Sequence, residues 1–329
     1  MNVQLKPIAI FVLLNIFLQN IYAQRFSNQK RYYSVGGSIN ALNYVGELDP
    51  GQSFISPSIR YTRPNFGLTG TYRYNQNVSF RATLNWGRIK GNDNVSAPTT
   101  DKQVGRKIRN LNFRSSIFEV KADVIYDFFE NRSYPEKRPE YTPYVFLGIA
   151  YFRHNPKGLS PDGKWVNLRP LQTEGYNYKL HQVAIPFGIG FRYKLAKQWD
   201  LAFEIGWRYT FTDYLDDVGG RGYNDPAKLT PLGRQMAFRS AEQQDKPFNK
   251  AGPAQIIYGP NGETFPLPDG SPLMAIKGFG GEYVINENGE AHWVSDPDRG
   301  DKNKDWYIIS GFHLTYIIPR RVVCPKFRY

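Results

Sequence analysis

Two clusters of carboxylates bracket the longest segment of the chain that lacks a strand-like pattern. One lies in the stretch TDYLDDV and the other in SDPDRGDKNKD. Carboxylate oxygens at this alternating spacing suit a hard cation such as Ca²⁺, although no full EF-hand pattern is present. The alternative is that they cap the loop through hydrogen bonds and form ion pairs with Arg299 and Arg221. The candidate calcium ligands are Asp213, Asp216, Asp217, Asp296, Asp298 and Asp301.

A second set of charged residues alternates with apolar ones. In SSIFEVKADVIYDFFE, residues 115–130, every second residue is apolar, and Glu119, Lys121, Asp123 and Asp127 stand between them. A soluble β-sandwich would bury the apolar face of such a strand. A membrane-spanning barrel would turn that face to lipid and the charged face to its lumen.

If the charged faces of the strands point into a barrel lumen, charges of both signs from several strands meet there. An eight-stranded barrel has an interior that side chains just fill, and an unpaired buried charge costs several kcal/mol. We therefore predict an internal salt-bridge network that plugs the barrel; the alternative is a proton or ion path through these charges. The predicted network comprises Arg73, Arg81, Glu119, Lys121, Asp123, Asp127, Arg192, Glu204 and Arg208.

Catalytic chemistry finds little support in the sequence. The four histidines, His154, His181, His292 and His313, show no metal-ligand spacing. His313 falls on the inward face of a strand, where a packed histidine is expected. A rim-sited acyltransferase or protease would need a histidine beside a serine or aspartate, and His154 is the one plausible candidate. We expect no enzyme, no catalytic residue and no cofactor beyond the candidate Ca²⁺.

The elements that must position these residues follow a period-two pattern. The alternating segments are longer than the roughly 5–6 residues common in soluble proteins, and they reach the about 9–11 residues that a tilted membrane strand needs. The pattern predicts an all-β fold, an eight-stranded up-and-down transmembrane β-barrel of the outer membrane. The predicted strands are 32–43, 66–74, 78–88, 113–129, 142–153, 181–195, 199–212 and 305–318.

The connections alternate in length, as in an outer-membrane barrel with short periplasmic turns and long extracellular loops. Residues 75–77 and 196–199 form short turns, although 130–141 is longer than this pattern requires. The long loop at about 213–304 contains apolar residues that pure linkers lack, so we expect it to fold over the barrel mouth. It contains a possible hairpin around 286–290 and a short helix within 225–238. The other long loops are 44–65, 89–112 and 154–180.

The N-terminus and the composition indicate export. Residues 1–23 have the basic start, short apolar run and small-residue end of a secretory signal peptide. Residues 24–329 then form a single barrel domain, with both termini periplasmic and a tail at 319–329. The net charge of +13 in an exported protein suits anionic lipid or acidic partners rather than nucleic acid. The single Cys324 excludes an internal disulfide, and its role is left open.

Five stretches resemble a known family: GGSINALNYVGELDP, RNLNFRSSIFEVKADVIYDFF, YTPYVFLGIAYFRHNPKG, IPFGIGFRYKLAKQWDLAFEIGWRYTFTDYLDDVGG and DKNKDWYIISGFHLTY. They are similar to the Bacteroidota outer-membrane β-barrel family that includes PorG of the type IX secretion system. The resemblance covers residues 32 to 318 and implies a barrel that tethers a periplasmic secretion ring to the outer membrane. The chain is longer than PorG proper, mainly through the loop at 213–304, which leaves room for a paralogue with another role.

These observations favour a non-enzymatic anchor or scaffold whose partners are outer-membrane lipid and periplasmic secretion-ring proteins. The basic, aromatic tail is the expected partner contact. The alternative is a surface barrel whose extracellular loops bind a ligand or shield the cell, and a rim enzyme is the least favoured reading. The expected contact residues of the tail are Arg320, Arg321, Lys326 and Phe327.

Overall fold

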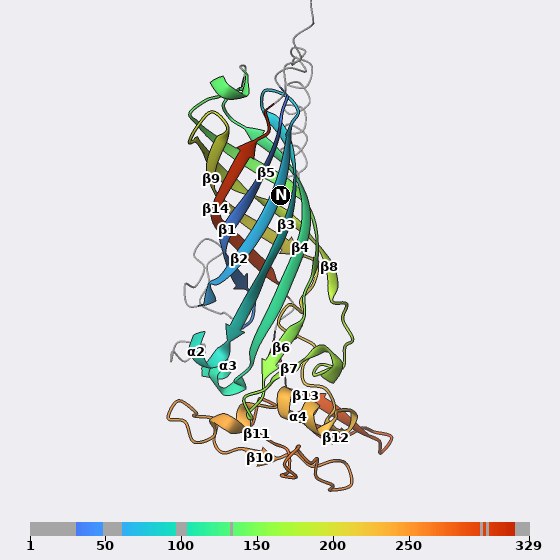
Figure 1. The fold of residues 1–329 in the computed structure, drawn as a ribbon. Helices are drawn as coiled ribbons and strands as arrows, with labels where there is room; N and C mark the ends of the chain where they lie inside the picture. Colours follow the sequence, from blue (N-terminus) through green and yellow to red (C-terminus); the bar gives the residue numbers. More distant parts are fainter. Residues whose placement is uncertain are drawn as a thin grey trace, which may run out of the picture.

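Eight antiparallel strands form a closed barrel in the computed structural model (Figure 1). The structure describes residues 31–48, 61–96, 104–131, 134–296, 299–300 and 303–319. The strands follow one another in the order β3-β2-β1-β14-β9-β8-β5-β4, and pairing of β3 with β4 closes the sheet. Their bounds are β1 Tyr33–Val45, β2 Arg63–Arg73, β3 Val78–Asn92, β4 Asn112–Asp127, β5 Tyr141–Arg153, β8 His181–Lys194, β9 Trp199–Thr210 and β14 Trp306–Ile317.

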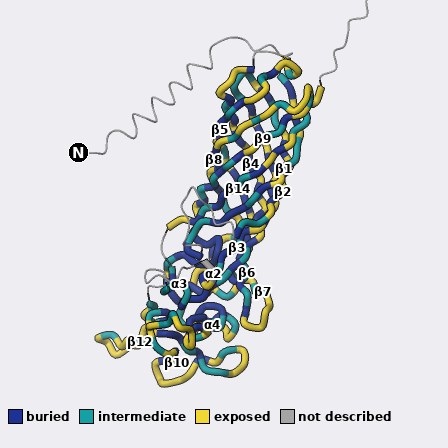
Figure 2. Tube along the Cα trace, turned by 90° about the vertical axis from the view of Figure 1, so that its left-hand side faces the viewer, coloured by how far each residue is buried: buried dark blue, intermediate teal, exposed yellow. Residues whose placement is uncertain are grey.

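The fold predicted from the sequence is confirmed: all eight predicted strands are present, with ends that move by a few residues. The alternation of side chains also follows the prediction, because successive residues of a strand point to opposite faces. In β3, Phe80, Leu84 and Trp86 are exposed on the outer wall, whereas Arg81 and Asn85 are buried inside. Figure 2 shows this alternation of buried and exposed positions along the barrel wall.

Short turns join the strands at one end of the barrel, which we call the short-turn end. Asn75 starts the β2–β3 turn, and its side-chain oxygen accepts hydrogen bonds from the backbone N–H groups of Asn77 and Val78. The longer β4–β5 connection holds the 3₁₀ helix η3, Pro135–Lys137. Arg138 fixes it against the β8–β9 turn by donating to Asp200 and to the carbonyls of 196, 197 and 199.

Glycines on the inner wall make room for large rings in the lumen. A Cβ at Gly190 would lie 2.3 Å from the ring of Tyr144, and one at Gly206 would lie 2.7 Å from the ring of Phe146. Both rings are buried, and they pack with Ile125 and Ala202 into a small apolar cluster near the short-turn end. The interior is therefore filled by side chains rather than left as a pore.

The opposite end, the long-loop end, carries an outer domain built from the loops (Figure 1). Its apolar core includes Ile108, Tyr223, Phe238, Leu273 and Phe279. The predicted helix within 225–238 and the predicted hairpin around 286–290 are both present, as α4 and as the pair β12–β13. Its elements are α2 Asp93–Ser96, α3 Val104–Arg109, β6 Pro156–Leu159, β7 Trp165–Asn167, η4 Arg169–Leu171, η5 Pro226–Lys228, α4 Pro231–Ala237, η6 Ser240–Gln243, β10 Gln255–Ile256, β11 Met274–Ala275, β12 Gly281–Ile285 and β13 Ala291–Ser295.

A second apolar cluster closes the barrel where it meets the outer domain. Leu42, Ile89, Phe113, Phe152 and Tyr307 point inward from five strands and are fully buried there. Residues from the outer domain, among them Leu215 and Met236, pack into the same cluster. The barrel and the outer domain, which covers the mouth of the barrel, therefore share one core.

Candidate functional site

The lumen contains a network of buried ion pairs. Arg81 contacts both Asp123 and Glu204, which come from different walls of the barrel. Lys121 also pairs with Asp123. All four side chains are almost fully buried, so the charges are neutralised by each other rather than by water.

Two further groups of ion pairs complete the network in the lumen. Asp127 accepts from Arg73 and from Arg192, the latter at 2.8 Å, near the short-turn end. Glu119 faces Arg208 at 3.4 Å towards the long-loop end. The structure thus brings all nine charged residues that the sequence analysis singled out into ion pairs within one lumen.

Neutral donors add further hydrogen bonds to two of these carboxylates. The hydroxyl of Tyr144 donates to Glu204 and that of Tyr307 donates to Glu119, each at 2.6 Å. The Asn85 amide also donates to Glu119, at 2.6 Å. His313 lies on the inward face, as expected, with its Nε2 3.7 Å from Glu204. Such additional hydrogen bonds are what make a buried ion pair tolerable.

Little free space remains in the lumen. The cavity between Arg73, Arg81, Tyr144 and Glu204 measures about 40 Å³. A neighbouring cavity beside Asp127 and Arg138 measures about 10 Å³. Spaces of this size accommodate a few water molecules at most. The apolar cluster at the long-loop end closes the other side, so the geometry is that of a plugged barrel.

Three buried carboxylates meet just below the cover of the barrel. The ligand atoms of Glu47, Asp216 and Asp305 lie within 4.8 Å of one another. The Tyr44 hydroxyl lies 2.7 Å from Asp216 Oδ2 and 2.8 Å from Asp305 Oδ1. The backbone N–H groups of Val218 and Leu215 donate to the remaining oxygens of Asp216 and Asp305, each at 2.9 Å.

Burial controls the protonation of this cluster. Desolvation raises the pKa of Asp216 to about 7. The pKa of Asp305 is also raised well above its usual value, first by burial and then by the charge of Asp216. The two carboxyls therefore retain protons at a pH where exposed ones are ionised. If the protons leave, three carboxylates at this spacing can hold a hard cation such as Ca²⁺.

The structure assembles this acidic cluster from one predicted calcium ligand and two other residues. Among the six predicted ligands, Asp216 alone belongs to the cluster within the described part of the chain. Asp217 is turned away by a backbone φ of 77° and accepts from Thr173 and Tyr178, both at 2.6 Å. Asp296 accepts from the N–H of Gly280 instead. Asp213 is buried near the mouth but outside the cluster, and Asp298 and Asp301 lie outside the described residues.

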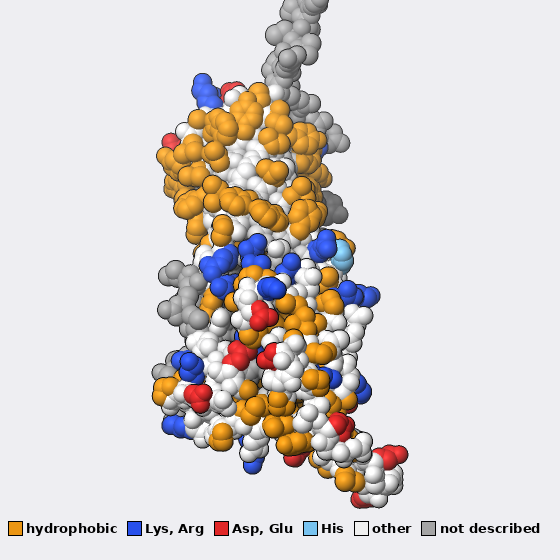
Figure 3. Space-filling model, turned by 60° about the horizontal axis from the view of Figure 1, so that its bottom comes forward, with side chains coloured by type: hydrophobic (Ala, Val, Ile, Leu, Met, Phe, Trp, Pro, Cys, Tyr) orange, Lys and Arg blue, Asp and Glu red, His pale blue; other side chains and the backbone are white. Residues whose placement is uncertain are grey.

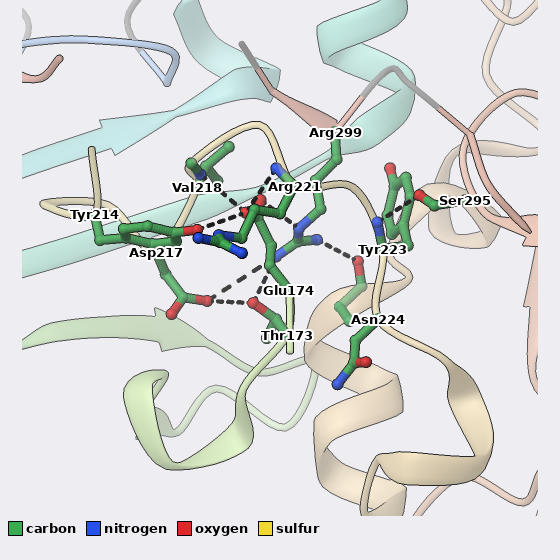
Figure 4. A network of polar contacts seen from close by, with 12 residues as sticks. Thr173, Glu174, Tyr214, Asp217, Val218, Arg221, Tyr223, Asn224, Ser295 and Arg299 are labelled. Carbon is green, nitrogen blue, oxygen red and sulfur yellow. Dashed lines mark hydrogen bonds and ion pairs between the residues drawn. The ribbon is translucent and has the colours of Figure 1, made fainter. Parts of the chain in front are cut away.

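A second polar network joins the outer domain to the barrel mouth (Figure 4). Arg299 is 1% exposed and donates to Glu174 at 3.0 Å and to the Thr173 hydroxyl at 2.7 Å. It also donates to the carbonyl of Ala237 at the end of α4 and lies 4.0 Å from Asp217. The predicted alternative was that the acids form ion pairs with Arg299 and Arg221. Arg299 lies within 4.0 Å of Asp217, whereas Arg221 lies over the ring of Tyr176.

Glu174 holds the loop that follows β9. Its Oε2 accepts from the N–H groups of Gly219 and Arg221, at 3.1 and 3.2 Å. Burial also raises the pKa of Asp217, to about 6, while the positive charge of Arg299 opposes that rise. Asp217 therefore changes its protonation near pH 6, within the network around Arg299.

A cleft opens on the side of the cover, between the loops 176–182 and 211–221. It encloses about 880 Å³. Tyr178 stacks on Tyr214 at 4.8 Å between ring centroids, and Tyr176 lies 5.2 Å from Tyr214. The guanidinium of Arg221 lies over the ring of Tyr176 at 4.3 Å, and Asp213 also lines the cleft.

His154, the candidate for rim catalysis, is part of the core. Its Nε2 faces the carbonyl of Lys179 at 3.2 Å, and its ring stacks on Tyr178 at 6.1 Å. Burial lowers its pKa to about 4, so the ring is neutral at physiological pH. Among the described residues, no carboxylate or serine hydroxyl is hydrogen-bonded to it. The geometry of a nucleophile, a base and an orienting acid is therefore not assembled around His154.

The residues that the sequence analysis passed over are mostly single members of these networks. Tyr44, Glu47 and Glu174 stand in loops or at strand ends with no repeated spacing to mark them. Asp305 is different: it is the last residue of the stretch SDPDRGDKNKD, which the sequence analysis noted as a carboxylate cluster, but it was not among the candidate calcium ligands. The predicted signal peptide, Cys324 and the expected contact residues of the tail lie outside the described residues.

The fold and the filled lumen define the class of the molecule: a closed eight-stranded barrel with an apolar outer wall and an ionic interior. No helix among the described residues is long and apolar enough to cross a membrane. The chain belongs to the family described as Domain of unknown function (DUF6089), whose model matches residues 9–231. No curated protein matches the chain.

Three solved structures are similar to the chain at low sequence identity. Neisserial surface protein A is 10% identical, with a TM-score of 0.35, and the match covers 86% of this chain and 96% of that one. The outer membrane protein OprG from Pseudomonas aeruginosa is 9% identical, with a TM-score of 0.37 over 88% and 98% of the two chains. The N-terminal barrel domain of OprF from the same organism is 10% identical, with a TM-score of 0.30 over 87% and 97%.

Proposed function

We propose that this chain is a non-enzymatic barrel of the outer membrane that anchors or scaffolds a larger assembly. The observation that supports it is the polarity of the barrel: exposed apolar side chains on the outer wall surround a lumen filled by ion pairs. Side chains such as Leu68 and Ile149, which are 67% and 68% exposed, would be costly in water over so large an area. In contact with the hydrocarbon of a bilayer, the same exposed side chains are favourable.

In this proposal the outer domain faces the outside of the cell, and both ends of the barrel chain lie in the periplasm. Outer-membrane barrels of this type have short periplasmic turns and longer extracellular loops. Protease added to intact cells should then cut the outer domain and leave a membrane-embedded barrel fragment. Cleavage only after the outer membrane is opened would contradict the orientation.

The finer proposal, a scaffold for the type IX secretion apparatus, rests on the resemblance to the PorG-containing family. Its partner would meet the tail that carries Arg320 and Arg321. Crosslinking in cells should then recover periplasmic secretion-ring proteins, and charge reversal at both arginines should abolish that recovery. The matched control is charge reversal at Lys164 and Lys277, which are exposed in the outer domain. Unchanged recovery after reversal of the tail charges would remove the tail from the contact.

A second candidate function, ligand binding by the extracellular loops, is favoured by the cleft. Its tyrosines offer apolar faces, and Arg221 and Asp213 offer hydrogen bonds, a combination that suits an oligosaccharide. The full chain in detergent can be applied to a panel of immobilised glycans. Replacement of Tyr176 by Ala should abolish binding, whereas Tyr258→Ala should not, because Tyr258 is exposed outside the cleft. Equal binding by both variants would exclude the cleft.

A further inference from the structure

The outer wall carries a row of cations across three neighbouring strands. Lys90 of β3 is directly opposite Arg114 of β4, and Arg114 is directly opposite Lys157 of β6. Directly opposed residues share one face of a sheet, so the three side chains stand side by side. Arg88, two residues before Lys90, points to the same face and is exposed. We call these four residues the basic row.

The charges of the basic row are not neutralised by neighbouring acids. In the part of the chain that the structure describes, none of the four forms an ion pair with a carboxylate. Lys90 instead lies in the repulsive field of Arg63 and Arg114, and Arg114 lies in that of Arg88. Like charges directly opposite each other destabilise a sheet. A row of them is therefore best explained by an anion from outside the chain.

One member of the row is held in a fixed orientation. The guanidinium of Arg114 lies over the ring of Trp165 in β7, 3.9 Å from its centroid. Stacking on an aromatic face restricts a long side chain that would otherwise sample many rotamers. A planar guanidinium can bind phosphate with two parallel hydrogen bonds. Arg114 is thus the best-placed member of the row to bind a phosphate group.

The basic row lies next to the apolar part of the outer wall. Trp86 and Phe118 are directly opposite each other, and they are 58% and 50% exposed. Arg88 follows Trp86 by two residues, a rise of about 7 Å along the strand. The headgroup layer of a bilayer is roughly 5–7 Å thick on each side of the hydrocarbon core. Figure 3 shows Lys and Arg side chains gathered along the edge of the apolar band.

We propose that the basic row binds the phosphate groups of phosphorylated glycolipid headgroups in the outer leaflet. This rests on the proposed location and orientation in the outer membrane. Three independent features support this binding: the uncompensated charge, the aromatic ring under Arg114 and the position of the row beside the apolar band. A soluble acidic partner would not require the cations to stand at that depth.

The test compares binding of defined lipids to the full chain in a neutral detergent by native mass spectrometry. Bisphosphorylated lipid A should bind, and its dephosphorylated form should bind far more weakly. Replacement of Lys90 and Arg114 by Gln should weaken binding about 30-fold, the effect of removing two cations near an anionic surface. The control with the same loss of charge, Lys164→Gln with Lys277→Gln, should bind as the wild type does.

Several outcomes would overturn the proposal. Unchanged binding by the Lys90→Gln, Arg114→Gln variant would do so, and so would equal binding of the dephosphorylated lipid. Inorganic phosphate that competes with the lipid at equal concentration would point to a free anion instead. If the double variant does not fold, Lys157→Gln replaces it, because Lys157 lies in β6 outside the closed barrel. Membrane fractionation of each variant tests the barrel proposal separately, since insertion does not depend on this row.

Discussion

Arg81 offers the sharpest test of the ionic lumen. Its guanidinium contacts Asp123 and Glu204 and also lies over the ring of Phe146 at 5.1 Å. Replacing Arg81 by Met keeps most of the volume and removes the charge. Asp123 would still pair with Lys121. Glu204 would lose its ion pair with Arg81 and keep the hydrogen bond from the Tyr144 hydroxyl and the nearby ring of His313. Breaking a buried pair in this way costs about 3–5 kcal/mol.

A double variant separates the lost pair from the stranded charge. In Arg81→Met with Glu204→Gln, the carboxylate that the first change leaves unpaired is neutral. Since a buried ion pair replaced by uncharged groups of similar volume is often nearly neutral in stability, most of the loss should be regained, to within about 1–2 kcal/mol of the wild type. The expected coupling between the two positions is therefore about 2 kcal/mol or more.

The assay is reversible unfolding by guanidinium chloride in detergent or lipid vesicles, followed by the fluorescence of the six tryptophans. The control is Arg88→Met, which removes the same charge seven residues further along β3 but from the outer wall. It should change stability by less than about 1 kcal/mol. Equal losses for Arg81→Met and Arg88→Met would refute the argument that the lumen charges must be paired.

Three further predictions follow from the other sites. The folded pKa of Asp216 is about 7, above the usual value near 3.9, so the folded state holds a proton that the unfolded chain releases. Asp216 alone should therefore make stability fall as the pH rises from about 4 to 7, by up to about 1.4 kcal/mol per unit. Asp216→Asn should remove this part of the slope in unfolding measured across that range. Arg299→Met should leave Glu174 and Asp217 buried without their cation, so limited proteolysis should cut the outer domain about a hundredfold faster or more while the barrel stays resistant. Leu84→Arg, on the lipid-facing wall, should cost about 2–4 kcal/mol in vesicles; a loss below about 1 kcal/mol would contradict that placement.

The barrel could be predicted because its strands obey a local rule. Period-two alternation identifies which residues share a face, and the opposite signs on that face predict that its charges pair. Arg81 and Asp123, which the structure places directly opposite each other in β3 and β4, are one such pair. The contact between Arg81 and Glu204 is different, because it crosses the lumen from β3 to β9. Such a contact depends on the closure and the diameter of the barrel, which no local spacing contains.

The cover of the barrel could be anticipated only in outline. The hairpin and the short helix have local turn and capping signals, such as Thr230, whose hydroxyl accepts from the N–H of Gly233 at the start of α4. The acidic cluster has none, because Glu47, Asp216 and Asp305 come from three separate parts of the chain. The sequence spacing favoured Asp213, Asp216 and Asp217 as a group, but the positive φ of Asp217 sends its side chain towards Thr173 instead.

At one level along the barrel, the polar and apolar faces of the wall exchange sides. This level separates the ion pairs of the lumen from the basic row. Along β3, the inward residues Arg81 and Asn85 are polar while the outward Leu84 and Trp86 are apolar. Beyond Trp86 the pattern inverts: Ile89 faces inward into an apolar core, and Arg88 and Lys90 face outward.

The partner strand β4 inverts at the same level. Glu119 and Asp123 face inward beside the outward Phe118 and Val120, whereas Ile117 and Phe113 face inward beside the outward Arg114. An extended apolar exterior is favourable in lipid, so in the proposed membrane placement this change of pattern marks where the hydrocarbon ends. The ion pairs of the lumen lie on the lipid side of that level, and the basic row begins on the other.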